Sequence, residues 1–403
     1  MQAVLFLFFC LTGLRGLFLY ADETMPMARA TLEVPRINSL AAVLMDATTG
    51  ELLYVKNENY VIPPASLTKL MTIHIALSEI AAGRASLDDI VALPPESWAS
   101  NQPRGSSLMF LNVGQTVTLR ELILGLVVPS GNDAAVAIAR HFDPSIEAFA
   151  ERMNRESRNM GLIKTYFVEP SGISEFNLVT ALEFAQFCRE YVRLHPEALQ
   201  EFHTVPVFAY PTADNVAERY RNRPGTIVQY NHNPLLGAFE GTDGLKTGYI
   251  DESGHNLALT AQQGNTRLIS VTLGATSSRE RNEDGFALFT WGFENFHTLR
   301  PIPEPLTPLP VWKGKTDEVS VAPSEQLEFT AFIERGHDMR WEASYIDPIV
   351  APVPVGRTVG ELTLYDSVGE LKRLPIVTTT EVEEGNFFKR LWDSIRLFFR
   401  KKD

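Results

Sequence analysis

A serine and a lysine lie three positions apart in the segment Ser66-Leu67-Thr68-Lys69. Residues with this spacing share a face of an α-helix, so on a helix the Ser66 hydroxyl and the Lys69 amine would be neighbours. A serine hydroxyl is a poor nucleophile until a base takes its proton. None of the eight histidines stands in a G-x-S-x-G or similar setting, so a Ser-His-Asp triad is not supported. Lys69 is the predicted base, provided that burial and a second cation lower its pKa.

Two further triplets carry polar groups that could complete such a site, Ser130-Gly131-Asn132 and Lys246-Thr247-Gly248. The first is a small polar turn between two apolar helical stretches, and the second opens an extended run. We expect Ser130 and Asn132 to relay a proton and to hold a substrate amide, and Lys246 to be the second cation. Each triplet alone has an ordinary structural explanation, as a helix break or as a turn into a strand. Their occurrence together, in this order, predicts one active site.

The backbone can supply the remaining requirement of acyl transfer, which is a site for the oxyanion. Two prolines precede Ser66 and set it at or near a helix start. The N–H groups at a helix N-terminus polarise a carbonyl and stabilise negative charge. We expect the second N–H from the strand that follows the Lys246 triplet, and we place it at Tyr249.

The elements that position these residues follow from periodicity and turn signals. Residues 41–45 and 51–55 read as a hairpin, and residues 67–82 as a mostly apolar helix. Thr118 and Glu121 have capping-box spacing, which predicts a helix over 119–128. Further expected elements are a helix at 133–141, strands at 245–250, 256–261 and 268–274 with a turn at 262–265, and a helix at 283–296.

A second domain is expected because 403 residues are too many for one typical core. Prolines at 301, 303, 305, 308 and 310 mark the boundary. Beyond it, short β-rich runs alternate with turn residues at 319–321, 327–333, 341–345, 361–365 and 371–377. We therefore expect a catalytic domain over 37–299 and a small all-β domain over 300–384, without evident catalytic residues.

The N-terminus has an apolar stretch over 3–11, and Ala21 offers a small residue for cleavage before Asp22. We predict a signal peptide over 1–21 and a linker over 22–36, and hence export. The alternative is a buried strand, because no Lys or Arg precedes the stretch and Arg15 interrupts the apolar run that continues after it. After cleavage only Cys188 would remain, which excludes an internal disulfide.

Charge is distributed unevenly along the chain. The net charge is −13; residues 1–21 carry +1 from Arg15 and residues 385–403 carry +4, so the body over 22–384 is about −18. An acidic body does not suit nucleic acid or anionic lipid. The histidines are scattered without metal-ligand spacing, so we expect neither a metal site nor a cofactor.

The tail over 385–403 has the composition of a helix that lies in a membrane interface. On a helical projection one face is apolar and consists of Phe388, Leu391, Trp392, Ile395, Phe398 and Phe399. Six basic residues make the segment too charged to span a bilayer. We predict a peripheral anchor on an anionic membrane surface. The alternative is a helix that packs on its own β domain.

The chain resembles the low-molecular-mass penicillin-binding proteins, and among them the D-alanyl-D-alanine carboxypeptidase family. An S-x-x-K motif, a Ser-containing triplet and K-T-G form the signature of such serine enzymes. The resemblance covers residues 37–403. It extends to the stretches Gly105-Ser106-Ser107-Leu108-Met109-Phe110, Ser130-Gly131-Asn132-Asp133-Ala134, Asp243-Gly244-Leu245-Lys246-Thr247-Gly248, Thr290-Trp291-Gly292-Phe293 and Glu384-Gly385-Asn386-Phe387-Phe388.

The resemblance implies an α+β fold of the β-lactamase/transpeptidase type. An antiparallel sheet would have helices on both sides, followed by a β-rich stalk and an amphipathic helix. It implies a serine D,D-carboxypeptidase on the periplasmic side of the cytoplasmic membrane that removes the terminal D-Ala from peptidoglycan pentapeptides and that β-lactams inhibit covalently. The matching positions are Ser66 (acylated), Lys69 (base) and Ser130 for catalysis, and Asn132, Lys246, Thr247, Gly248, Tyr249 and Arg281 for substrate binding. Lys246, Thr247 and Arg281 would read the terminal carboxylate.

The segment 167–173 departs from the family, because Glu169 stands where Asn is usual. A carboxylate there could assist deacylation, as in class A β-lactamases, although those enzymes carry Asn where this chain has Ile173. A surface glutamate in a loop is the simpler interpretation. Two further alternatives stay open. One is a D,D-endopeptidase that acts on cross-linked peptides, and the other is a non-catalytic wall-binding scaffold, against which the intact Ser66, Lys69 and Lys246 argue.

Overall fold

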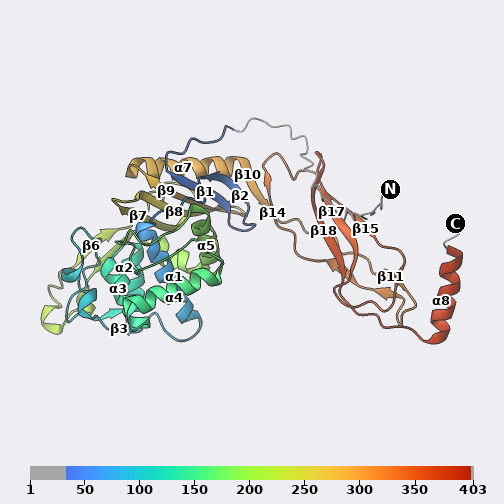
Figure 1. Ribbon diagram of the computed structural model, residues 1–403, viewed down its shortest axis with the longest axis horizontal. Coiled ribbons are helices and arrows are strands. Elements are labelled where there is room, and N and C mark those ends of the chain that lie inside the picture. The colour runs from blue at the N-terminus through green and yellow to red at the C-terminus, as the bar shows by residue number, and fades with distance from the viewer. Residues whose placement is uncertain (1–32, 401–403) are drawn as a thin grey trace, which may run out of the picture. The chain divides into compact units, whose positions relative to one another are not determined.

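A computed structural model describes residues 33–400 (Figure 1). The predicted signal peptide and most of the predicted linker lie outside the described residues. Residues 33–38 have no regular secondary structure and lead into the first strand.

A five-stranded antiparallel sheet with the order β2-β1-β9-β8-β7 organises the predicted catalytic domain. The expected hairpin joins the first two strands, and the three strands expected after residue 240 follow one another as hairpins, so these predictions are confirmed. The edge strand β7 carries the Lys246 triplet. The strands are β1 (Ala41–Asp46), β2 (Leu52–Lys56), β7 (Thr242–Ile250), β8 (Gly254–Gln263) and β9 (Thr266–Ala275).

The helices flank this sheet. They are α1 (Lys69–Ala81), α2 (Leu119–Val127), α3 (Asn132–Phe142), α4 (Ile146–Asn159), α5 (Ala181–Leu194), α6 (Pro196–Ala198) and α7 (Ser278–Asn295). The capping box of Thr118 and Glu121 begins α2, as predicted. The predicted start of α7 at 283 was wrong, because Ser277 accepts a hydrogen bond from the Glu280 N–H and begins the helix at Ser278. Neither α4 nor α5 was predicted.

Alternation along the strands sends apolar side chains to both faces of the sheet. Val43 of β1 packs in a core with Phe184 of α5, whereas its neighbour Leu44 packs in a core with Leu288 of α7. Helices α5 and α7 contact the same strand β9 and lie on opposite sides of the sheet in Figure 1. The predicted α+β architecture, with helices on both sides of an antiparallel sheet, is confirmed.

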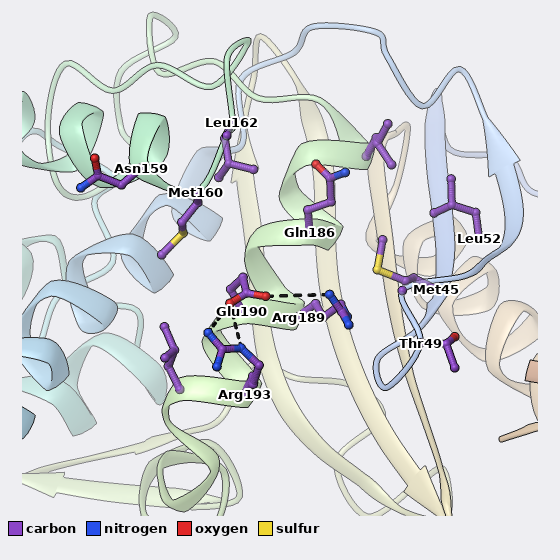
Figure 2. Close-up of a pocket in the computed structure, with 14 residues that line it drawn as sticks. Met45, Thr49, Leu52, Asn159, Met160, Leu162, Gln186, Arg189, Glu190 and Arg193 are labelled. Carbon is purple, nitrogen blue, oxygen red and sulfur yellow. Dashed lines mark hydrogen bonds and ion pairs between the residues drawn. The ribbon is translucent and has the colours of Figure 1, made fainter. Parts of the chain in front are cut away.

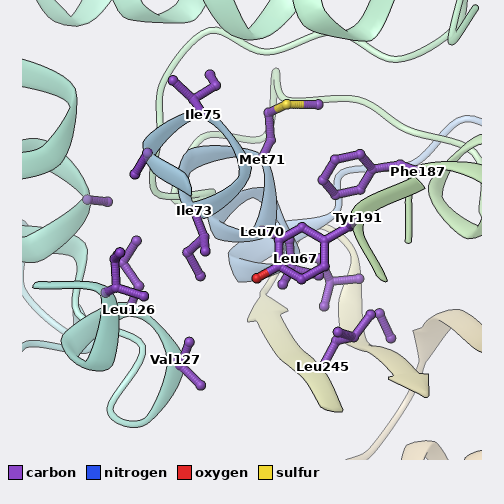
Figure 3. Packing of buried hydrophobic residues seen from close by; sticks show 14 of the residues in the cluster. Leu67, Leu70, Met71, Ile73, Ile75, Leu126, Val127, Phe187, Tyr191 and Leu245 are labelled. Atoms are coloured by element: carbon purple, nitrogen blue, oxygen red, sulfur yellow. The ribbon is translucent and has the colours of Figure 1, made fainter. Parts of the chain in front are cut away.

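Helix α1 is buried over residues 69–77. Its apolar residues share one core with Leu126 of α2, Tyr191 of α5 and Leu245 of β7 (Figure 3). A helix that is apolar on all sides belongs in the interior, where each leucine contributes about 1.5–3 kcal/mol. This packing carries Lys69, at the first position of α1, into the protein interior.

Short strands complete the predicted catalytic domain. The strands after residue 300 form the C-terminal domain. The C-terminal strands assemble mainly into sheets with the orders β13-β18-β17-β15 and β12-β11-β16, around a core that includes Val311, Val359 and Ile376. The predicted β-rich runs therefore form strands of an all-β domain, and a helix follows it. These elements are β3 (Ile90–Val91), β4 (Val117–Thr118), β5 (Val207–Tyr210), β6 (Ile227–Tyr230), β10 (Phe296–Leu299), β11 (Leu309–Trp312), β12 (Glu318–Val319), β13 (Val321–Pro323), β14 (Phe329–Phe332), β15 (Arg340–Tyr345), β16 (Ile349–Val350), β17 (Thr358–Tyr365), β18 (Glu370–Thr378) and α8 (Phe387–Arg400).

Within residues 33–400, no helix combines the length and the apolar character that crossing a bilayer requires.

Candidate active site

The Lys69 amine lies at the centre of the candidate site and is fully buried. It donates hydrogen bonds to Ser66 Oγ at 2.9 Å, to Asn132 Oδ1 at 2.7 Å and to the Ser171 carbonyl at 2.6 Å. Ser66 lies in a 3₁₀ turn, Ala65–Thr68, that runs directly into α1. The structure therefore places the hydroxyl and the amine side by side, as their spacing predicts.

The three acceptors differ in what they can do once Lys69 has lost a proton. The Asn132 amide oxygen and the Ser171 carbonyl can only accept, so they hold the two N–H groups of a neutral amine. The Ser66 hydroxyl can donate, so the amine lone pair faces its proton. Burial lowers the pKa of Lys69 to about 7, while the charges of Glu169 and Asp133 act in the opposite direction. A base with this pKa is partly neutral at neutral pH, as general-base catalysis requires.

The turn between α2 and α3 brings a second hydroxyl to the site. Ser130 is 3% exposed, lines the same cleft as Ser66, and has a φ of +63°, a left-handed conformation that is uncommon outside glycine. The buried Asp133 carboxylate accepts hydrogen bonds from the N–H groups of Met109 and Phe110, each at 2.8 Å. Asp133 thereby holds the backbone at Met109 and Phe110. This backbone comes shortly after residues 105–107, which line the cleft.

Strand β7 passes directly beside Ser66. A Cβ atom added at Gly248 would lie 2.8 Å from the Pro64 carbonyl oxygen and 3.0 Å from the Ser66 nitrogen, so this approach requires glycine. The contact brings the backbone of β7 to the Ser66 N–H. The predicted pair of oxyanion donors, the N–H groups of Ser66 and Tyr249, therefore lies on neighbouring segments.

Lys246 precedes the cleft-lining residue Thr247 on β7 and is 2% exposed. Its amine donates a hydrogen bond to the Thr247 carbonyl at 3.0 Å. Burial, followed by repulsion from Lys69 and Arg281, lowers the pKa of Lys246 well below its ordinary value. The charge of Lys69 thus acts on the pKa of Lys246, whereas burial lowers the pKa of Lys69. That Lys246 lowers the pKa of Lys69 stays a prediction. A carboxylate above Lys246 would favour its charged form.

Ser66 lies between the two halves of one open cleft. One half, about 470 Å³ in volume, is lined by Ser66, Ser130, Thr247 and Arg281 among others. Arg281 comes from the N-terminal part of α7. A carboxylate in this half would meet the guanidinium of Arg281 and the hydroxyl of Thr247. The other half, about 520 Å³, includes Ser66, Asn132 and Tyr249 in its lining.

His232, which the sequence does not predict as a site residue, lines the half of the cleft that contains Arg281. The asparagines on either side of it hold its backbone in place: Asn231 Nδ2 donates to the His203 carbonyl at 3.1 Å, and Asn233 Nδ2 donates to the Gly244 carbonyl at 3.1 Å. Burial, then Lys246, Arg281 and Lys69, lower the pKa of His232 to about 4, so the imidazole is neutral at neutral pH. No sequence pattern identifies a lone histidine of this kind.

Glu169 is also more than a surface glutamate in a loop. Its carboxylate accepts hydrogen bonds from the Ser171 N–H and hydroxyl at 2.7 and 2.6 Å and from the Gly172 N–H at 2.7 Å. Asn177 Nδ2 donates to the same carboxylate at 2.8 Å. Both oxygens are therefore occupied in holding the turn that delivers the Ser171 carbonyl to Lys69.

A larger cavity of about 840 Å³ contains none of the predicted site residues (Figure 2). Its charged groups already have partners within the protein. Arg189 donates to the carbonyls of Ala47 and Thr48, each at 2.9 Å, and Arg193 donates to Glu190 at 2.7 Å. This cavity consequently offers no counterpart to the Ser66 cleft.

The structure brings all nine predicted residues to one place. The cleft is lined by Ser66, Ser130, Asn132, Thr247, Gly248, Tyr249 and Arg281, and the buried amines of Lys69 and Lys246 donate hydrogen bonds to lining residues. A family model described as D-alanyl-D-alanine carboxypeptidase matches residues 28–277. The chain belongs to this family. A second model, the C-terminal domain of penicillin-binding protein 5, matches residues 300–384. Membership confirms the prediction of a serine D-alanyl-D-alanine carboxypeptidase.

Individual relatives agree with the family assignment. The D-alanyl-D-alanine carboxypeptidase DacC of Escherichia coli (strain K12) is 34% identical over 96% of this chain and 95% of its own length. The crystal structure of penicillin-binding protein 5 from Haemophilus influenzae matches with a TM-score of 0.76 at 28% identity, over 87% of this chain and 99% of that one. Penicillin-binding protein D2 from Listeria monocytogenes, in its ampicillin-bound form, matches with a TM-score of 0.55 at 28% identity, over 64% of this chain and 100% of that one.

Proposed function

We propose that the protein releases the terminal D-Ala of peptidoglycan pentapeptides through an acyl-enzyme on Ser66. Neutral Lys69 takes the Ser66 proton while Oγ attacks the carbonyl carbon of the penultimate D-Ala. The N–H groups of Ser66 and Tyr249 stabilise the oxyanion that forms. When the C–N bond breaks, the leaving amine receives the proton from Lys69 through Ser130. The products of this step are free D-Ala and an ester on Ser66.

Hydrolysis of the ester completes the turnover. Water adds to the ester carbonyl, the bond to Oγ breaks, and Ser66 regains its proton as the shortened peptide leaves. Lys69 is again neutral and next to Ser66, so it is the base available for this water. Glu169 has both carboxylate oxygens engaged within its loop and is not assigned this role.

The observation that carries the proposal is the set of three hydrogen bonds that aims the Lys69 amine at Ser66. Incubation of the full chain with a soluble pentapeptide should release free D-Ala, and Ser66→Ala should abolish the release. Cleavage of a cross-linked peptide dimer without release of D-Ala from the pentapeptide would favour an endopeptidase. A protein that processes neither peptide and forms no penicillin adduct would be a scaffold.

The same residues support covalent reaction with β-lactams. Opening of the lactam ring by Ser66 uses the same base and oxyanion donors, and the β-lactam carboxylate fits the half of the cleft that contains Arg281. The structure of the Listeria monocytogenes protein with bound ampicillin supports this part of the proposal.

We further infer that the protein is exported and that α8 anchors it to a membrane surface. Large apolar side chains of α8 are exposed, among them Phe388 at 79%, Trp392 at 63% and Phe399 at 63%. Asp393, in contrast, is buried and accepts a hydrogen bond from the Lys313 N–H at 2.7 Å. Unlike an isolated surface helix, α8 is thus fastened to the β domain through its polar face while its apolar face stays exposed.

The basic residues of α8 contribute less to lipid binding in this arrangement than the sequence alone suggests. Three of them form ion pairs with acidic residues outside the helix: Lys389 with Asp317, Arg390 with Glu384 and Arg400 with Asp347. We therefore assign most of the membrane affinity to burial of the aromatic face and a smaller share to attraction by anionic lipid.

A further inference from the structure

The two halves of the cleft receive different parts of the peptide. The half with Arg281 and Thr247 takes the terminal carboxylate, and with it the leaving D-Ala. The other half shares Ser66 and contains Asn132, so it takes the acyl part of the substrate. The residue before the penultimate D-Ala, which is the third of the pentapeptide, must place its side chain in or beside this acyl half.

Three charged residues from two separate segments line the acyl half. Arg104 stands beside Gly105, and Asp251 and Glu252 follow the end of β7. Within residues 33–400, none of the three forms an ion pair with another residue. Asp251 accepts a hydrogen bond from the Tyr249 hydroxyl at 2.5 Å, which holds its carboxylate at the cleft. Charges of both signs therefore face one cavity without neutralising each other.

We propose that this acyl half is a subsite for a third residue whose side chain ends in both an ammonium and a carboxylate group. Asp251 and Glu252 bind the ammonium, and Arg104 binds the carboxylate. The proposal rests on the carboxypeptidase function, since it assigns which peptide the same site prefers. A side chain with an ammonium alone can pair only with Asp251 and Glu252, and an apolar side chain can pair with none of the three charged residues.

The size of the preference follows from exposure. Arg104, Asp251 and Glu252 are exposed, and water and salt weaken ion pairs in such positions. Each contact is therefore expected to change kcat/KM by about 2- to 5-fold. The preference should become smaller as the salt concentration rises, because salt screens contacts between charges. A preference that came from apolar contacts would not change with salt.

The test compares three synthetic peptides that end in D-Ala-D-Ala and differ only in the preceding residue, which is 2,6-diaminopimelate, lysine or norleucine. The wild type should process them in that order of kcat/KM. Glu252→Gln should reduce the advantage of both diaminopimelate and lysine over norleucine. Arg104→Gln should reduce the advantage of diaminopimelate over both lysine and norleucine, and should leave the advantage of lysine over norleucine unchanged. Glu151→Gln and Arg155→Gln, which remove exposed charges from α4, serve as matched controls and should leave the ratios unchanged.

Ratios between peptides on one enzyme preparation separate the subsite from the overall activity. Equal kcat/KM for the three peptides on the wild type, or ratios that Arg104→Gln and Glu252→Gln leave unaltered, would overturn the subsite while leaving the carboxypeptidase assignment intact. Failure of all three peptides to release D-Ala would instead contradict the proposed function itself.

Discussion

Glu169 and Lys69 are connected through one residue, Ser171. The Glu169 carboxylate accepts hydrogen bonds from the Ser171 N–H at 2.7 Å and from its hydroxyl at 2.6 Å, while the Ser171 carbonyl accepts one from the Lys69 amine at 2.6 Å. The carboxylate thus orients a ligand of the catalytic amine without touching the amine. Its negative charge also raises the pKa of Lys69, against the larger effect of burial.

Removing the charge of Glu169 should therefore shift the pH dependence of acylation. In Glu169→Gln the pKa of Lys69 falls further, so the low-pH limb of the acylation rate should move to lower pH. The measurement is the rate of penicillin acylation from pH 5 to pH 9, roughly the range in which such bases titrate. It gives the position of the low-pH limb in the wild type and in the variant. Glu175→Gln, an exposed glutamate of the same loop, is the control and should leave the limb in place.

The Glu169→Gln variant also decides the β-lactamase-like alternative. If acylation keeps the wild-type pH profile while the penicillin adduct persists much longer, Glu169 is a deacylation base and the positioning role is wrong. Thermal melting of the variant shows whether the loop still holds its structure.

Lys69 should act through its basicity. Acylation requires the neutral amine, so the rate should be highest above pH 7 and fall about tenfold per pH unit well below it. Lys69→Arg keeps a cation that cannot deprotonate near neutral pH, and the loss of a general base typically costs on the order of 10²–10⁴ in rate. Stopped-flow acylation of Lys69→Arg within a few-fold of the wild type would remove lysine from this role.

Arg281 should read the substrate carboxylate together with Thr247 and the charge of Lys246. A partly desolvated, charge-assisted contact is worth about 1.5–3 kcal/mol, so Arg281→Ala should lower kcat/KM about 10-fold or more. Amidation of the peptide C-terminus should lower it similarly in the wild type and much less in the variant. Arg279→Ala, on the exposed side of the same helix, is the control. Equal effects of amidation on wild type and Arg281→Ala would assign the carboxylate to other groups.

Membrane association should depend on α8 and chiefly on its apolar face. Deletion of residues 385–403 should release the protein from vesicles that contain phosphatidylglycerol, without loss of penicillin acylation. Replacing Phe388 and Trp392 by serine should release it nearly as well, because burial of aromatic side chains supplies most of the affinity. Lys389→Gln should have the smaller effect, since this amine already pairs with Asp317. A truncated protein that still sediments fully with vesicles would place the anchor elsewhere.

The sequence motifs predict those parts of the site that are close in the chain or lie on regular elements. Ser66 and Lys69 share a helical turn, and the Lys246 triplet opens an extended run that is followed by two further strand-like runs. The start of α7 was missed although Ser277 stands three residues before Glu280, the spacing of a helix N-cap. Similar signals stand before α5, where Thr180 accepts from the Glu183 N–H.

Other parts of the site leave no trace in the sequence. The third acceptor of the Lys69 amine is the backbone carbonyl of Ser171, and any residue type can supply a carbonyl. His232 reaches the cleft because the asparagines beside it bind distant carbonyls. The pKa of Lys69 likewise depends on how completely the fold buries it. These features arise from tertiary packing, which residue spacing does not encode.

The most direct test of the central claim is to locate the acylated residue. Intact-mass measurement after incubation with penicillin should show one added adduct mass on the full chain, and peptide mapping should place it on Ser66. Ser66→Ala should remain folded and show no adduct. An adduct on any other residue, or on Ser66→Ala, would contradict the assignment of Ser66 as the nucleophile that Lys69 activates.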